Sequence, residues 1–127
     1  MITEDYVSFE TAKLLKEKGF DETLYAIYDI DGTLDANHCP FSNTTECAGF
    51  ECVAPTLQMA MKWLREVYNC AICISPYWPE GDMRNKLTWD FTIHSLIDNR
   101  SFRECNYMDN YEQACEAAIK YCLENLI

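Results

Sequence analysis

The segment APTLQMAMKWLREVYNCAICI, residues 54–74, decides the fold class that we expect, because a helical pattern runs directly into a strand pattern. Pro55 and Thr56 suit a helix start: proline there loses no needed donor, and the threonine hydroxyl can accept a backbone N–H. The segment therefore predicts a core helix leading into a core strand that ends at Ser75-Pro76. The apolar stripe of this helix recurs at helical spacing and comprises Leu57, Ala60, Met61, Leu64 and Val67.

Residues 87–94 form the clearest strand pattern further along the chain. Apolar and polar side chains alternate there with a period of two, so one face should lie on the core and the other should face water. This alternation is typical of an antiparallel sheet and not of a parallel sheet covered on both faces. The apolar set is Leu87, Trp89, Phe91 and Ile93, and the polar set is Thr88, Asp90, Thr92 and His94.

Two further helices and a hairpin are signalled by their end residues. Ser8 suits the N-cap of a first helix that Gly19 ends, and Asp109 with Glu112 predicts a capping box for a last helix. Between them, the strand-forming residues 25–28 precede an Asp31-Gly32 pair, which is a strong signal for a hairpin with a second strand at 33–34.

Taken together, these elements predict one α+β domain spanning residues 1–127. The expected order is helix, strand, strand, helix, strand, strand, helix, with an antiparallel sheet of about four strands packed against the helices. Residues 36–53 are turn-rich and without a sustained period, so we expect a long loop there. A second wide connection, from Pro76 to Lys86, contains Gly81-Asp82.

Charge and hydropathy narrow the classes of partner that the protein can bind. The chain has 127 residues with 21 acidic and 10 basic side chains, a net charge of −11, which argues against binding the nucleic-acid backbone. No apolar run approaches the roughly 20 residues of a membrane span, and the N-terminus lacks the pattern of a signal peptide. We expect a cytoplasmic protein with no nucleic-acid, membrane or cofactor ligand, and the sequence leaves homo-oligomer formation open.

The eight cysteines are expected to be reduced and free of metal, as in a reducing compartment. The alternative is a zinc site. Its candidates are His38, Cys39, Cys47 and Cys52 in the long loop, with Cys70 and Cys73 at the two-residue spacing of a zinc knuckle. Cys70 and Cys73 bracket an apolar strand, however, and would point to opposite faces of it.

Residues 26–34, AIYDIDGTL, resemble the first motif of the haloacid-dehalogenase-like phosphatases. That resemblance implies that Asp29 is a nucleophile, that Asp31 is a general acid and base, and that both lie near a magnesium ion. The family also needs a parallel sheet that presents further residues, for which Ser75, Lys86 and Asp98 are the candidates. The same nine residues also fit a hairpin that turns at Asp31-Gly32.

Tyr77 and Trp78, next to Pro76 and Pro79, are the candidate binding residues. Two large aromatic side chains on a connection between strands can anchor a partner protein. The alternative is that they fold back over the sheet edge and extend the core.

Three stretches, SFETAKLLKEKGFD at 8–21, APTLQMAMKWLREVYN at 54–69 and YEQACEAAIK at 111–120, resemble a family of small proteins of uncharacterised function. That family occurs in Bacteroides-group bacteria, their phages and mobile elements. The resemblance implies a turn without a fixed aspartate pair at 29–34, which favours the hairpin. It also implies a small, acidic, non-enzymatic protein that binds a host or competing-element protein, for example as an inhibitor; the alternative hypothesis is a magnesium-dependent phosphohydrolase using Asp29 and Asp31.

Overall fold

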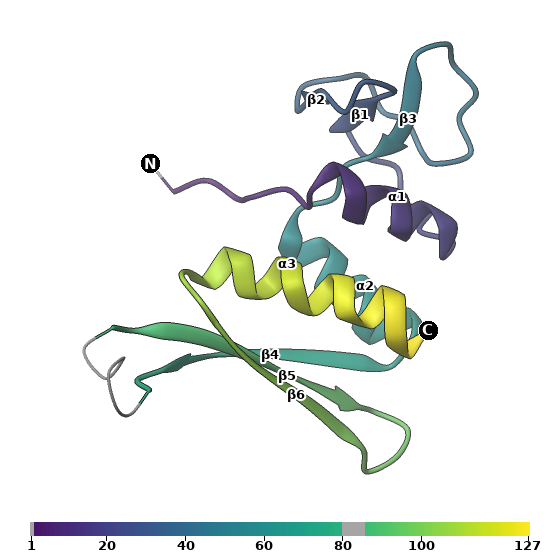
Figure 1. The fold of residues 1–127 in the computed structure, drawn as a ribbon. Helices are drawn as coiled ribbons and strands as arrows, with labels where there is room; N and C mark the ends of the chain where they lie inside the picture. Colours follow the sequence, from purple (N-terminus) through teal and green to yellow (C-terminus); the bar gives the residue numbers. More distant parts are fainter. Residues whose placement is uncertain (1, 80–85) are drawn as a thin grey trace. The chain divides into compact units, whose positions relative to one another are not determined.

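The computed structural model describes residues 2–79 and 86–127, and of residues 104–106 the backbone alone. The chain divides into two compact units, residues 1–60 and residues 61–127, and each is described by itself. Each unit contains a three-stranded antiparallel sheet together with helices (Figure 1). The predicted α+β class with antiparallel pairing is confirmed, but two sheets stand where one sheet of about four strands was expected.

Helix α1, Phe9–Glu17, begins and ends where its cap residues predict. The Ser8 hydroxyl accepts a hydrogen bond from the backbone N–H of Thr11 at 3.2 Å. At the other end Gly19 has a φ of +94°, and the backbone N–H of Phe20 donates to the carbonyl of Leu15 at 2.9 Å, which closes the helix in the usual left-handed manner. The helix packs against β3 of the same unit.

The first sheet has the strand order β2-β1-β3 and comprises β1, Ile27–Asp29, β2, Leu34–Asp35, and β3, Phe50–Val53. The predicted hairpin is present: β1 pairs with β2 around the turn that contains Gly32, whose φ is +80°. The expected loop at 36–53 is corrected at its end, because residues 50–53 form β3. Only four residues long, this strand is too short to show a period, and its pairing with β1 defines it.

Helix α2, Leu57–Val67, also begins where predicted, since the Thr56 hydroxyl accepts from the backbone N–H of Met59 at 3.2 Å. Four members of the predicted stripe are buried, but Val67 is 54% exposed and therefore does not belong to it. Trp63, which we did not assign to the stripe, is buried instead. The boundary between the two compact units falls inside this helix, after Ala60.

The second sheet has the order β4-β5-β6, with β4 at Cys70–Tyr77, β5 at Thr88–Ser95 and β6 at Ser101–Met108. The expected end of β4 at Ser75-Pro76 is corrected, because the strand continues to Tyr77. It tolerates Pro76 because it is an edge strand. No strand was predicted between residue 94 and the last helix, yet residues 101–108 form β6. Gly81-Asp82 lies outside the described residues.

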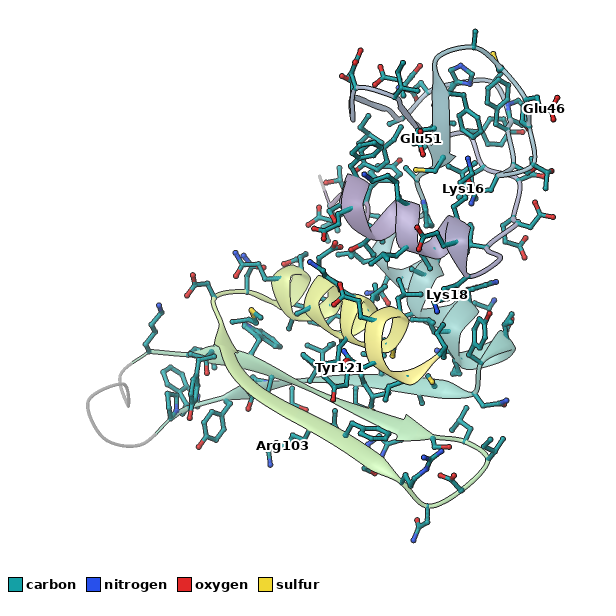
Figure 2. The ribbon with its side chains drawn as sticks, turned by 45° about the vertical axis from the view of Figure 1, so that its right-hand side comes forward. Lys16, Lys18, Glu46, Glu51, Arg103 and Tyr121 are labelled. Carbon is teal, nitrogen blue, oxygen red and sulfur yellow. The ribbon has the colours of Figure 1, made fainter. Side chains whose placement is uncertain are left out.

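Helix α3, Tyr111–Tyr121, covers one face of this second sheet, and a π-helical segment, Cys122–Leu126, continues it. Tyr121 lies between the helix and the sheet (Figure 2), with its ring centroid 6.0 Å from that of Phe91. The predicted capping box is shifted by one residue: the Asn110 side chain accepts from the backbone N–H of Gln113 at 2.8 Å. In the part of the chain that the structure describes, no helix combines the length and the apolar character that crossing a membrane requires.

Candidate partner-binding surface

The face of the second sheet opposite α3 gathers side chains from all three strands, and we call it the open face. Cross-strand pairs in an antiparallel sheet share a face. Because Trp89 and Phe91 contact α3, their neighbours Thr88 and Asp90 point to the open face, opposite Tyr77 and Ser75 respectively. The open face comprises Cys73, Ser75, Tyr77, Thr88, Asp90, Thr92, Arg103 and Tyr107.

Aromatic side chains collect at one end of β4. The rings of Tyr77 and Tyr107 lie with their centroids 6.1 Å apart, so two strands that are not neighbours contribute to one aromatic pair. Tyr107 has a φ of +51° and belongs to the irregular part of β6, between the pairs Trp89↔Met108 and Phe91↔Glu104. Trp78, which follows directly on Tyr77, is 61% exposed. Of the two predicted binding residues, Tyr77 is thus half-buried against Tyr107 and Trp78 is exposed.

Asp90 is the unusual residue of the open face, because its carboxylate is buried and accepts no hydrogen bond from the residues that the structure describes. Its exposed fraction is 3%, and neither carboxylate oxygen has a hydrogen-bond partner within the described residues. The carboxylate forms an ion pair with the guanidinium of Arg103, whose Nη2 atom lies 3.6 Å from Oδ2. Leaving a buried acceptor unsatisfied costs about 1–3 kcal/mol, and more for a charged group.

The alternation pattern predicted that Thr88 and Asp90 would face water, and this is corrected by the structure. Thr88 is completely buried, and its hydroxyl donates to the carbonyl of Tyr77 at 3.1 Å. Period-two alternation assigns a side chain to a face of the sheet, but it does not say whether other groups cover that face. Arg103 also lies on the open face, and its side chain points away from the sheet on the side opposite α3 (Figure 2).

The open face offers the groups that recognise a cation. Aromatic rings attract an ammonium or guanidinium group through their negative faces. A carboxylate with free lone pairs accepts strong, charge-assisted hydrogen bonds from the same groups. Arg103 is 60% exposed at its side chain, so its guanidinium can move without disturbing the core.

Asp29 and Asp31, the residues of the phosphatase hypothesis, lie at the β1–β2 turn. Oδ1 of Asp29 accepts from the backbone N–H groups of Asp31 at 2.9 Å and Thr33 at 3.0 Å, so this carboxylate stabilises the turn. The strand that ends at Asp29 pairs antiparallel on both sides, whereas the phosphatase resemblance implies a parallel sheet. A pocket of about 240 Å³ adjoins Asp29, lined also by His38, Phe41 and Phe50.

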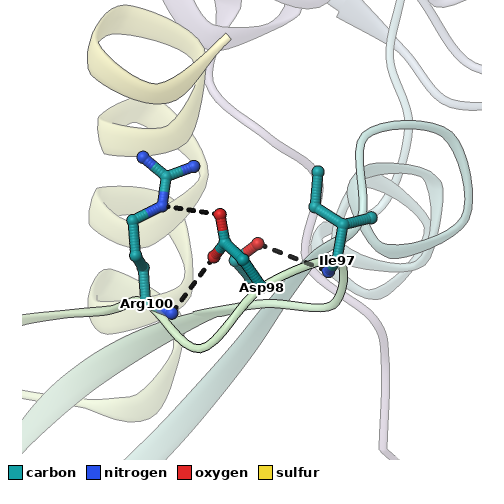
Figure 3. A network of polar contacts seen from close by, with 4 residues as sticks. Ile97, Asp98 and Arg100 are labelled. Atoms are coloured by element: carbon teal, nitrogen blue, oxygen red, sulfur yellow. Dashed lines mark hydrogen bonds and ion pairs between the residues drawn. The ribbon is translucent and has the colours of Figure 1, made fainter.

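The further phosphatase candidates, Ser75, Lys86 and Asp98, lie in residues 61–127. Lys86 and Asp98 make local contacts, and Ser75 has no specific role among the described residues. Lys86 forms an exposed ion pair with Asp109 at 2.8 Å, and Ser75 is an exposed residue of β4. Asp98 accepts from the backbone N–H of Arg100 at 3.1 Å in the β5–β6 hairpin (Figure 3). That hydrogen bond is the main reason why the pKa of Asp98 is lowered. Figure 3 also shows Nε of Arg100 donating to the other carboxylate oxygen of Asp98 at 2.9 Å.

The zinc candidates do not form a ligand cluster in the described part of the chain: no group of three or more His, Cys, Asp or Glu side chains is close enough to hold a metal. In the long loop, Nδ1 of His38 lies 3.5 Å from Sγ of Cys39. Burial raises the pKa of the Cys52 thiol to about 11, and it does the same for Cys115. Burial also raises the pKa of Cys70 and, further still, that of Cys122.

Comparison of the chain with protein families, with curated proteins and with solved structures finds no match.

Proposed function

We propose that this protein is a non-enzymatic interaction protein that binds a partner protein through the open face and Trp78. The observation that carries the proposal is the exposed Trp78 beside the Tyr77–Tyr107 pair, next to the buried carboxylate of Asp90. Tryptophan and tyrosine are the residues most enriched among those that dominate binding energy at interfaces. This proposal keeps the hypothesis from the sequence of a small acidic protein that binds, and can inhibit, a host or competing-element component in the cytoplasm.

The partner should present a basic side chain. The chain carries a net charge of −11, which attracts positively charged proteins over a distance of about one Debye length. At the open face, a lysine or arginine of the partner would lie against the rings of Tyr77 and Tyr107 and donate to Asp90 after Arg103 has moved aside. A donor there would satisfy an acceptor that the described residues leave without a hydrogen bond.

Site-specific photo-crosslinking in lysate of a bacterial host tests the proposal. A photoreactive amino acid in place of Trp78 should capture a discrete protein, and excess unlabelled wild-type protein should compete for that capture. Excess Trp78→Ala protein should compete poorly. The matched control carries the photoreactive residue at Leu96, which is also exposed, at 53%, and lies in the β5–β6 connection of the same unit. Equal capture from both positions, or equal competition by Trp78→Ala, would contradict the proposal.

Salt and a substitution at Asp90 test whether the partner is basic. Binding of the captured partner should weaken as salt concentration rises, and Asp90→Asn should weaken it while the fold is kept. Binding that does not depend on salt or on the charge at position 90 would leave the aromatic contact standing and refute the basic partner.

A further inference from the structure

Strand β4 is an edge strand that carries no charge. It has eight residues, Cys70–Tyr77 with the sequence CAICISPY, and β5 is its only neighbour in the sheet. The carbonyl of Tyr77 also accepts from the Thr88 hydroxyl, and within the described residues no backbone hydrogen bond joins β4 to a segment other than β5. Proteins usually protect a long edge strand with charges, prolines or bulges, because its free N–H and C=O groups pair readily with another strand. Strand β4 has a proline, Pro76, near its C-terminal end, but no charged residue.

The opposite edge of the same sheet is protected in that way. Strand β6 carries the charged residue Arg103, and its pairing with β5 is irregular between Trp89 and Phe91. In the first sheet, the edge strands β2 and β3 are only two and four residues long. Among the strands that the structure describes, β4 is therefore the one whose length and lack of charge suit pairing with another chain.

We propose that β4 pairs antiparallel with β4 of a second copy of this chain, joining two three-stranded sheets into one sheet of six strands. A two-fold axis brings identical strands together, so any charge on the strand would face a like charge. In a chain with a net charge of −11, the need to avoid like charges across the axis excludes most surfaces. Strand β4 has no charged residue and therefore meets this need. The axis is perpendicular to the sheet, so α3 of both copies lies on the same face.

Pro76 indicates which backbone groups are available for this pairing. Proline has no N–H, so its nitrogen has to point away from β5 toward the open edge. Since backbone groups alternate along a strand, Ile72 and Ile74 also direct their N–H and C=O groups to that edge. Their side chains lie on the α3 face opposite Ile93 and Phe91, and both are only half-buried. A second copy would cover them.

The alternation also selects the register. Residues that direct their backbone groups to the edge must lie opposite one another, and the greatest overlap then places either Cys73 or Ile74 on the axis. An axis at Ile74 would set Pro76 of one copy opposite Ile72 of the other and leave the carbonyl of Ile72 without a donor. An axis at Cys73 pairs Ile72 with Ile74 and moves Pro76 to the ends. Cys73 then faces its own copy as a non-hydrogen-bonded pair, with Cα atoms about 4.5 Å apart.

The oligomeric state of the wild-type protein tests the proposal directly. Sedimentation velocity over a wide range of protein concentrations should show a monomer–dimer equilibrium, and raising the salt concentration should shift it toward dimer by screening the negative charges. A short bismaleimide should cross-link the dimer through Cys73, which is exposed, and Cys73→Ser should abolish this cross-link. The self-association uses backbone groups at the edge of the sheet, whereas the proposed partner binding uses side chains of its open face.

Two lysine substitutions at exposed positions provide the matched comparison. Cys73→Lys places two like charges at the axis and should raise the dimer dissociation constant by on the order of tenfold or more. Ser101→Lys, on the edge strand β6, should leave the constant unchanged. Cys73→Ser serves as the neutral control and should still form dimers in sedimentation. A wild-type monomer at every concentration, or equal loss of dimer in both lysine variants, would overturn the proposal.

Discussion

Replacing Gly32 with alanine should destabilise the protein through two separate effects. Its φ of +80° is disfavoured for any residue with a Cβ, at a cost of about 1–2 kcal/mol. A Cβ at this position would also lie 2.9 Å from Cδ2 of Phe9, closer than carbon atoms normally approach. The Phe9 ring is held by the ring of Tyr28, with centroids 5.3 Å apart, so moving it costs about a further 1–3 kcal/mol as for other overpacked sites.

The chain contains a matched control for the first effect. Gly19 has a φ of +94°, but a Cβ there would meet no atom within 4 Å, so Gly19→Ala should show the conformational cost alone. Both substitutions restrict the unfolded chain equally, and that contribution cancels in the comparison. Urea unfolding should therefore find Gly32→Ala less stable than Gly19→Ala by about 1–3 kcal/mol.

The Phe9 contact can be isolated further. In a Phe9→Ala background the difference between the two alanine variants should vanish, because the ring that opposes the new Cβ is gone. Asp29→Asn should change stability by about 0.5 kcal/mol at most, since the amide oxygen can still accept from Asp31 and Thr33. If Gly32→Ala and Gly19→Ala were equally destabilising, the packing of Phe9 over the β1–β2 turn would be refuted.

Three further predictions concern the core and the thiols. Phe91→Ala should lower the free energy of unfolding by about 3–5 kcal/mol and Thr88→Ala by about 1–2 kcal/mol, measured by urea unfolding, because both side chains are buried and Thr88 donates a hydrogen bond. If Thr88→Ala left the stability unchanged, the burial of Thr88 would be contradicted. In native protein without reductant, a thiol reagent should label Cys39, Cys47 and Cys73 quickly, with Cys52 and Cys115 labelled only on unfolding. All eight thiols should react once the protein is denatured, and any disulfide would leave a shortfall. Burial raises the pKa of Cys52 and Cys115 from 9.0 to about 11, so these thiols ionise at lower pH in the unfolded chain than in the folded protein. Their contribution to stability should therefore be lost as the pH rises from about 9 to about 11. Measuring the urea unfolding midpoint against pH, for wild type and for the Cys→Ala variants, tests this loss.

Helix positions could be predicted because short-range groups determine them. Ser8 and Thr56 each accept a hydrogen bond from a backbone N–H three residues further on, so the signal and the structure lie within one turn. For the last helix, short-range groups did not identify the N-cap residue. Two residues could serve as the N-cap of this helix: Asp109, which Glu112 follows, and Asn110, which Gln113 follows. The prediction named Asp109, whereas the structure uses Asn110.

Strands β3 and β6 could not be predicted because their pairing is not local. Residues 50–53 have no period of their own and become a strand through pairing with β1, more than twenty residues earlier in the chain. Strand β6 is polar along much of its length and irregular opposite Asp90, which disguises the alternation. In contrast, β5 combines a regular period with large apolar residues, and its prediction as a strand was confirmed, although Thr88 and Asp90 are buried where exposure was expected.

The proposed binding surface likewise contains residues that the sequence indicates locally and residues that only the strand pairing brings together. Tyr77 and Trp78 were recognisable because two large aromatic residues stand between prolines. Asp90, Arg103 and Tyr107 were not, because they join Tyr77 only through the register of three strands. That register also separates the two surfaces we propose: side chains on the open face serve a partner, whereas backbone groups on the edge of β4 serve a second copy. Trp78→Ala should therefore impair partner capture without changing dimer formation, because Trp78 follows β4 and lies outside the paired residues. Cys73→Ser, which adds no charge to the open face, should leave both dimer formation and partner capture in place.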